Sequence, residues 1–158
     1  ERGPDPGKGC TGMKIGVACD HGGLSMKGLV VETLRDNSAE VVDLGTDTSA
    51  SVDYPDYARK AVDLLLGGGC DRIVLICGTG IGMSICANRF PGVRGTLCHD
   101  CYTARMSRMH NDSNCLILGG RVLGPAIARE IVEIWLKTGF EGGRHGARLE
   151  KIEGGHWR

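Results

Sequence analysis

Residues 73–82 read IVLICGTGIG, and this stretch decides the fold. Its first half, Ile73–Cys77, is apolar at every position, which is typical of a central parallel strand covered on both faces. Its second half places glycines at positions 78, 80 and 82, just where a helix is expected to begin at Ile81. A buried strand that turns through glycines into a helix indicates an α/β protein.

The same alternation of strands and helices continues on both sides of this stretch. The predicted strands are 14–19, 41–44, 73–77, 93–98 and 115–118, and the predicted helices are 24–34, 55–66, 81–88, 101–110 and 125–138. Strands that alternate with helices in this way indicate a three-layer α/β/α sandwich, Rossmann-like, around a five-stranded parallel sheet with right-handed crossovers. We predict the strand order 2-1-3-4-5.

The length of 158 residues predicts one domain. Residues 1–12 are rich in glycine and proline, and we expect them to form a flexible leader before a single domain over 13–158. Residues 139–158 form a basic, glycine-punctuated tail without a strand pattern. This tail is expected either to pack against the domain or to be disordered.

The composition excludes several classes of protein. Nineteen basic residues balance nineteen acidic ones, so no net positive field attracts nucleic acid. No apolar segment approaches the roughly 18 residues of a membrane span, and no secretory leader precedes the eight cysteines. Several of these cysteines lie in apolar strand-like segments, which favours a cytoplasmic protein with reduced, buried thiols.

Ligands of open parallel sheets bind outside the carboxyl ends of the strands. Polar side chains follow four of the predicted strands there: Asp20 and His21, Cys77 and Thr79, His99 and Asp100, and Arg121. We therefore expect the reactive groups to gather at one edge of the sheet. The basic residues Arg144, His145 and Arg148 of the tail are expected to join Arg121 there, because arginine forks match phosphate oxygens.

Cys77 and the glycines after it form the most informative group. With side chains removed at Gly78, Gly80 and Gly82, successive backbone N–H groups can point at an anion or a developing oxyanion. A cysteine beside a helix start also favours its thiolate form. The alternative is a buried structural cysteine, and the sequence leaves both open. His21 and His110 also have purely structural alternatives. His21 would be an exposed residue beside an Asp N-cap, and His110 would be a residue favoured by the helix dipole at the end of a helix.

Three other patterns carry little weight. The GxGxG spacing at 78–82 fits neither the dinucleotide motif GxGxxG nor the phosphate-binding GxxxxGK[ST] motif. Cys98 and Cys101 form a CxxC pair, but no second pair is spaced to complete a structural zinc site. Cys115 and Arg121 match the C-x5-R spacing of thiol phosphatases, yet Cys115 begins a predicted strand rather than a phosphate loop.

Taken together, the segments over about 13–152 resemble the type B ribose-5-phosphate isomerase family, which includes allose-6-phosphate and galactose-6-phosphate isomerases. The segments that carry the resemblance are Cys19–Gly23, Asp53–Pro55, Cys77–Gly82 with Ser84, Ala87 and Asn88, His110–Asp112 with Asn114, Gly119–Arg121, and Gly142–His145 with Arg148. Singly these motifs are weak, but their combination is specific.

The resemblance implies an aldose–ketose isomerase that interconverts ribose 5-phosphate and ribulose 5-phosphate through an enediol, without a metal or organic cofactor. It implies Cys77 as the base, His110 as the group that opens the sugar ring, and Thr79 with the amides of Gly80, Ile81 and Gly82 around the enediolate, next to Gly78. The implied ligands of the sugar hydroxyls are Asp20, Tyr54 and Asn111, and those of the phosphate are His21, Arg121, Arg144 and Arg148. It further implies a homodimer or homotetramer with the site at the subunit interface.

Three other functions remain open from the sequence. The motifs do not fix sugar length, so a hexose 6-phosphate isomerase is the nearest alternative. A non-catalytic sugar-phosphate-binding protein of the same fold is the second. A flavodoxin-like nucleotide or flavin binder is the third, and the aromatic content of 4% disfavours it because stacking partners are scarce.

Overall fold

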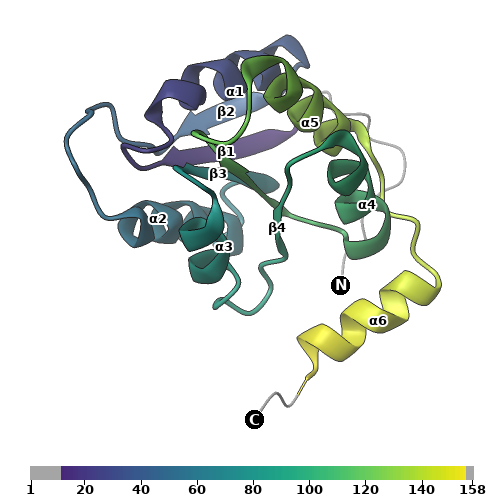
Figure 1. The fold of residues 1–158 in the computed structure, drawn as a ribbon. Helices are drawn as coiled ribbons and strands as arrows, with labels where there is room; N and C mark the ends of the chain where they lie inside the picture. The colour runs from purple at the N-terminus through teal and green to yellow at the C-terminus, as the bar shows by residue number, and fades with distance from the viewer. Residues whose placement is uncertain (1–11, 156–158) are drawn as a thin grey trace.

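The computed structural model describes residues 12–155 and contains one parallel sheet (Figure 1). Its strands are β1 (Lys14–Cys19), β2 (Glu40–Asp43), β3 (Arg72–Cys77), β4 (Gly95–Leu97) and β5 (Cys115–Gly119). All pairings between neighbouring strands are parallel, as the sequence predicted. The leader predicted over 1–12 lies outside the described residues, except for Gly12.

The predicted strand order 2-1-3-4-5 is wrong in its last two places, because the observed order is β2-β1-β3-β5-β4. Every residue of β5 is buried, and its apolar segment Leu116–Leu118 needs cover on both faces. β4 has three half-buried residues and tolerates an edge position. β5 therefore pairs with β3, with Cys77 opposite Gly119, and β4 lies outside β5.

Helices cover both faces of the sheet, which confirms the three-layer arrangement. The helices are α1 (Leu24–Asp36), α2 (Tyr54–Leu66), α3 (Ile81–Ala87), α4 (Cys101–Asn111), α5 (Pro125–Lys137) and α6 (Arg144–Glu153). One core joins α1, α4 and α5 to Val74 and Ile76 of β3. The other joins α2 and α3 to Ile73, Leu75 and Cys77. Alternate residues of β3 thus serve opposite cores, and Cys77 belongs to the α2–α3 side.

The tail contains a helix that the sequence reading missed. α6 begins after Gly143, which has φ +56°, and its main contacts are with α4. Figure 1 shows α6 in yellow, extending away from the sandwich at the lower right. The spacing of His145, Leu149 and Ile152 was the available signal for this helix, since the three residues lie on one helical face. Among the described residues, none of the helices is both long and apolar enough for a membrane span.

Gly23, which precedes α1, and Gly28, which lies within it, make a matched test of how tightly the helix packs at its start. A Cβ at Gly23 would lie 2.4 Å from the carbonyl oxygen of Ile76, whereas a Cβ at Gly28 would meet nothing within 4 Å. We expect Gly23→Ala to destabilise the protein by about 1–3 kcal/mol through overpacking. Gly28→Ala should stabilise it by about 0.5–1 kcal/mol, because alanine favours a helix interior. Urea unfolding at one protein concentration measures both, and equal effects would contradict the packing.

Candidate active site

The loop after β3 holds Cys77 beside a row of glycines. Gly80 has φ +78° and precedes α3, so a residue without a Cβ is favoured there. Its backbone N–H donates a hydrogen bond to the Sγ atom of Cys77 over 3.1 Å. Cys77 is 5% exposed and lies at the last position of β3, so the thiol is at the boundary between the core and the carboxyl edge of the sheet. A donor aimed at sulfur stabilises negative charge on it.

The other described cysteines are less suited to proton transfer. Burial raises the pKa of the Cys19 thiol to about 11. Burial also raises the pKa of the remaining thiols, namely Cys70, Cys86, Cys98, Cys101 and Cys115. These six sulfur atoms therefore stay protonated near neutral pH.

The end of β1 lies directly against the loop that follows β3. A Cβ on Gly22 would lie 2.8 Å from the backbone nitrogen of Gly78, so the two loops touch. Asp20 is buried, and its Oδ1 atom accepts a hydrogen bond from the N–H of Gly23 over 3.1 Å. The Nδ1 atom of His21 accepts from the N–H of Val52 over 3.2 Å, which leaves its Nε2 atom to carry the proton and to donate.

Arg121 and Tyr54 close two sides of the same loop. The Nη1 atom of Arg121 lies 3.3 Å from the position of a Cβ on Gly78, and its backbone N–H donates to the carbonyl oxygen of Gly78 over 2.9 Å. The ring of Tyr54, the first residue of α2, lies 2.7 Å from the position of a Cβ on Gly82. The glycines at 78 and 82 thus make room for a guanidinium group and an aromatic ring.

Ten of the predicted site residues therefore meet at the carboxyl edge of the sheet. Thr79 and Ile81 complete this group, with the Oγ1 atom of Thr79 accepting from the N–H of Ile81 over 3.3 Å. We call this group the carboxyl-edge cluster; it comprises Asp20, His21, Tyr54, Gly78, Gly80, Gly82, Arg121, Cys77, Thr79 and Ile81.

The remaining four predicted residues lie elsewhere, so the expectation that Arg144 and Arg148 join Arg121 at the carboxyl edge is wrong. His110 and Asn111 end α4, which starts beyond the carboxyl end of β4 and finishes before the first residue of β5. Eleven residues of helix span about 16 Å, so these side chains lie near the amino edge. Arg144 and Arg148 lie on α6, which packs against α4. Arg144 and Arg148 belong to a helix rather than to a loop that follows a strand, so the rule for strand ends does not place them.

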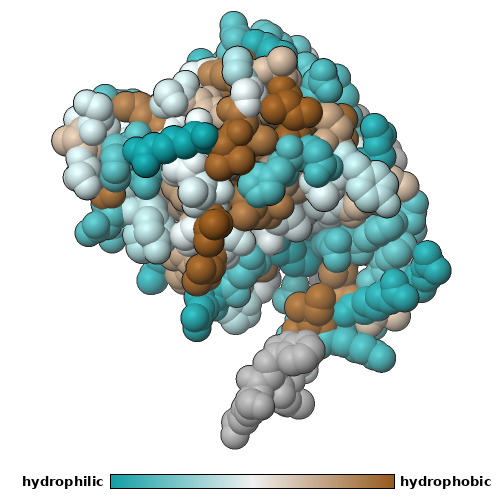
Figure 2. Space-filling view, in the orientation of Figure 1, coloured by the Kyte–Doolittle hydropathy of each residue, from teal (hydrophilic) through white to brown (hydrophobic). Residues whose placement is uncertain are grey.

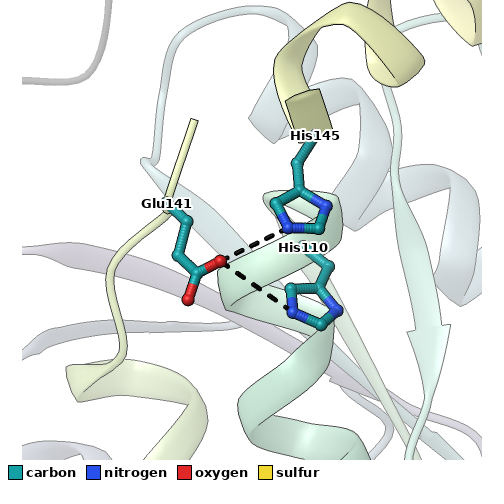
Figure 3. A group of neighbouring side chains, drawn as sticks. All are labelled: His110, Glu141 and His145. Atoms are coloured by element: carbon teal, nitrogen blue, oxygen red, sulfur yellow. Dashed lines mark ion pairs between the residues drawn. The ribbon is translucent and has the colours of Figure 1, made fainter. Parts of the chain in front are cut away.

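His110 belongs to a compact group of three side chains that come from α4, α6 and the segment between α5 and α6 (Figure 3). Its ring stacks on that of His145 with centroids 4.2 Å apart and planes 12° apart. The Oε2 atom of Glu141 lies 3.3 Å from Nε2 of His145 and 4.0 Å from Nε2 of His110. Burial of His145 and the neighbouring His110 and Arg144 lower the pKa of His145, while Glu141 raises it. Sequence reasoning did not single out Glu141, although it stands four residues before His145.

Other residues of the motifs hold the chain in place. The guanidinium of Arg94 binds Asp112 at 3.2 Å and Glu153 at 3.0 Å, and so ties α6 to the end of α4. Asn114 accepts the N–H of Arg94 over 2.8 Å. Asp100, inside the CxxC pair, caps α4 by accepting the N–H of Thr103 over 2.7 Å. These contacts explain part of the sequence pattern by structural roles, without a role in catalysis.

The comparison with protein families decides where the chain belongs. The model of the ribose/galactose isomerase family matches residues 15–152. The chain belongs to this family. It is accordingly a sugar-phosphate isomerase of the ribose/galactose isomerase type, and the match includes both the carboxyl-edge cluster and the three side chains around His110.

Named relatives of this isomerase cover nearly the whole chain. It is 50% identical over 141 residues to the putative sugar phosphate isomerase YwlF of Bacillus subtilis, with 89% of this chain and 95% of the relative covered. It is 46% identical over 139 residues to ribose-5-phosphate isomerase B of Escherichia coli, covering 88% and 93%. A relative from Pectobacterium atrosepticum, 37% identical with 89% and 93% covered, is named D-erythrulose-4-phosphate isomerase.

A solved structure has the same fold. The structure of Clostridium thermocellum ribose-5-phosphate isomerase B superimposes with a TM-score of 0.88 at 49% identity, covering 90% of this chain and 96% of that one. The family and the fold are therefore the same across the described domain.

Proposed function

We propose that this isomerase interconverts ribose 5-phosphate and ribulose 5-phosphate, with Cys77 as the base. The observation that carries the proposal is the position of this thiol, which accepts the N–H of Gly80 at 3.1 Å and precedes Gly78, the residue beside which the guanidinium of Arg121 lies. The names of the Escherichia coli relative and the Clostridium thermocellum structure support the choice of substrate.

The chemistry needs a base and a stabilised oxyanion. The thiolate of Cys77 takes the proton from C2 of the open-chain aldose, the freed electron pair forms the C1=C2 bond, and the carbonyl electrons move onto O1. A proton then passes from the C2 hydroxyl to O1, the C2 carbonyl forms, and the thiol of Cys77 returns its proton to C1. Hydrogen moves within the sugar, so the reaction consumes no external oxidant or reductant and we propose no cofactor. A positioned base contributes about 10²–10⁴-fold, and one oxyanion donor about 10²–10³-fold. Because the amide of Gly80 donates to the sulfur and that of Ile81 donates to Thr79, we assign the enediolate to the hydroxyl of Thr79 and the amide of Gly82.

The separation of the two groups of side chains supports a site shared between two copies of the chain. Asp20, His21, Tyr54 and Arg121 lie with Cys77, whereas His110, Asn111, Arg144 and Arg148 lie near the other edge. A symmetric homodimer, alone or within a homotetramer, can bring the second group of one copy onto the first group of the other.

An apolar surface beside the carboxyl-edge cluster is consistent with such an assembly. Ile81 and Ile85 of α3 are 54% and 59% exposed. Hydrophobic residues, coloured brown, reach the surface on the side of the molecule seen in Figure 2. Exposed isoleucines at the rim of a site favour contact with another protein chain.

A cytoplasmic location, expected from the cysteines, remains a prediction.

The proposed substrate is tested by comparing sugar phosphates in one coupled assay. We expect the highest kcat/KM with ribose 5-phosphate. A higher value with allose 6-phosphate or galactose 6-phosphate would favour the hexose alternative, and one with D-erythrulose 4-phosphate would favour the reaction named for the Pectobacterium relative. Binding of these compounds without turnover would favour a non-catalytic sugar-phosphate-binding protein.

The phosphate contact is tested by Arg144→Ala. We expect the variant to raise KM more than it lowers kcat, because the phosphate end of the sugar is bound alike in the ground state and the transition state. Arg35→Ala, which removes an exposed arginine in the last turn of α1, is the control and should leave both constants unchanged. An unchanged KM in Arg144→Ala would remove this arginine from the phosphate site.

A further inference from the structure

Glu141 faces both histidines of the stacked pair through a single oxygen atom. Its Oε2 atom lies 3.3 Å from Nε2 of His145 and 4.0 Å from Nε2 of His110, as the dashed lines in Figure 3 show. Its backbone N–H donates to the carbonyl oxygen of Met109 over 3.0 Å, which fixes the residue next to the last turn of α4. The backbone of Glu141 is therefore bound to the helix that carries His110, and Glu141 stands four residues before His145 in the sequence.

The arrangement suits an electrostatic contact better than a shared metal ion. The three side chains are close enough to hold an ion, since their candidate ligand atoms all lie within 4.8 Å of one another. A ligating imidazole, however, holds its metal in the plane of the ring. Two rings stacked 12° from parallel have no common in-plane point beside Glu141. The attraction between the carboxylate and the hydrogen on each Nε2 atom, which does not require an in-plane position, is left as the interaction.

The direction in which the rings point has a chemical consequence. A carboxylate facing Nε2 favours the tautomer with hydrogen on that atom, and the other ring nitrogen then keeps its lone pair. Both rings turn Nε2 toward Glu141, so Nδ1 is the atom left to accept a proton. A neutral imidazole in the other tautomer would turn a lone pair toward the carboxylate, which is unfavourable.

We propose that Glu141 is a positioning residue that holds the stacked rings of His110 and His145 with Nε2 toward its carboxylate, so that Nδ1 of His110 is the atom that moves the proton in ring opening. This inference rests on the proposed function, in which His110 opens the sugar ring. In that step, Nδ1 removes the proton of the anomeric hydroxyl, and the freed electron pair forms the carbonyl bond. The bond between the anomeric carbon and the ring oxygen breaks, and the ring oxygen takes the proton back from Nδ1.

The charges around the pair also make Glu141 important. His110 on α4 and the cations Arg144 and Arg148 on α6 all oppose a proton on His145, and Glu141 is the anion that favours it. Arg94 lies beside the end of α4, where Asp112 and Glu153 balance its charge. Among the described groups that act on His145, Glu141 is the anion on the Nε2 side of the rings. Without its carboxylate, the stacked rings would face the cations of α6 with no opposing negative charge there.

The test is Glu141→Gln, which keeps the shape of the side chain and removes its charge. We expect kcat with ribose 5-phosphate to fall about ten- to a hundredfold, as for other residues that orient a reacting imidazole, with KM changed less than threefold. The acid limb of the kcat profile should move to lower pH, because the anion that faces both Nε2 atoms and favours a protonated imidazole is lost. Glu150→Gln removes an exposed charge on α6 and should change neither quantity.

A second measurement does not depend on turnover. At pH 8, the ¹⁵N shifts of the imidazoles in the wild-type protein should show hydrogen on Nε2 of His110 and His145. In Glu141→Gln the tautomers should become mixed, and Glu141→Asp should recover part of kcat. Hydrogen on Nδ1 of both rings in the wild type, or a Glu141→Gln variant with wild-type kcat and pH profile, would overturn the proposal. If the wild type isomerises no sugar phosphate, the proposed function fails, but the tautomers still decide what Glu141 does to the rings.

Discussion

The Cys77→Ala variant is expected to lose isomerisation of ribose 5-phosphate by about 10²–10⁴-fold in kcat, the contribution of a positioned base. KM should change little, because the arginines and His21 that are proposed to hold the phosphate remain. The fold should survive, since the substitution removes one sulfur atom at the end of β3 and leaves the paired backbone intact. The coupled assay gives both constants, and thermal unfolding of the two proteins checks the fold.

Two further variants separate the base from a general effect of losing a thiol. Cys77→Ser keeps the volume and the acceptor for the N–H of Gly80, yet it should also be nearly inactive because a hydroxyl ionises far less readily than a thiol. Cys101→Ala removes a thiol whose Sγ contacts Glu130 away from the carboxyl-edge cluster, and should keep wild-type kcat. Equal turnover of Cys77→Ala and the wild type would remove Cys77 from the mechanism.

The sequence predicted the layers of the fold because a short-range pattern determines them. The fully apolar β3 and the alternation of strands with helices lead directly to a parallel sheet covered on both faces, and the strand and helix boundaries agree closely with those observed. The order of β4 and β5 depends instead on which of the two strands has more apolar surface to bury. That difference was readable, since Leu116–Leu118 is continuously apolar whereas the residues around Gly95 and Thr96 are not.

The sequence predicted part of the geometry of the candidate site, while the roles of its residues stay predictions. Nine of the named residues lie with Cys77 at the carboxyl edge, because strand-end loops converge there. His110 and Arg144 do not, because their positions depend on where helices end and on how α6 packs against α4. Glu141 was missed for a related reason. Its role appears only when the segment between α5 and α6 places it beside two rings from different helices.

The division of the site between two edges leads to the second large effect, which is recovery of activity by mixing two inactive chains. Cys77→Ala and His110→Ala should each be nearly inactive alone. Co-expressed in equal amounts, they should assemble at random, and an intact site needs Cys77 from one type of chain and His110 from the other. Half of the chains carry Cys77 and the other half carry His110, so about a quarter of the sites contain both residues. About a quarter of wild-type activity should therefore return, whatever the size of the symmetric oligomer.

A matched mixture separates this result from a site within one chain. The double variant Cys77→Ala/His110→Ala, co-expressed with wild type, should again give about a quarter of the activity if the two residues act across an interface. If both residues act within one chain, the double-variant mixture gives about half and the mixture of single variants gives none. The two mixtures contain the same numbers of Cys77 and His110 side chains, so any difference between them reports only on how those side chains are distributed. Equal recovery in both would therefore place His110 of one copy beside Cys77 of another, and a half-and-none result would refute the shared site.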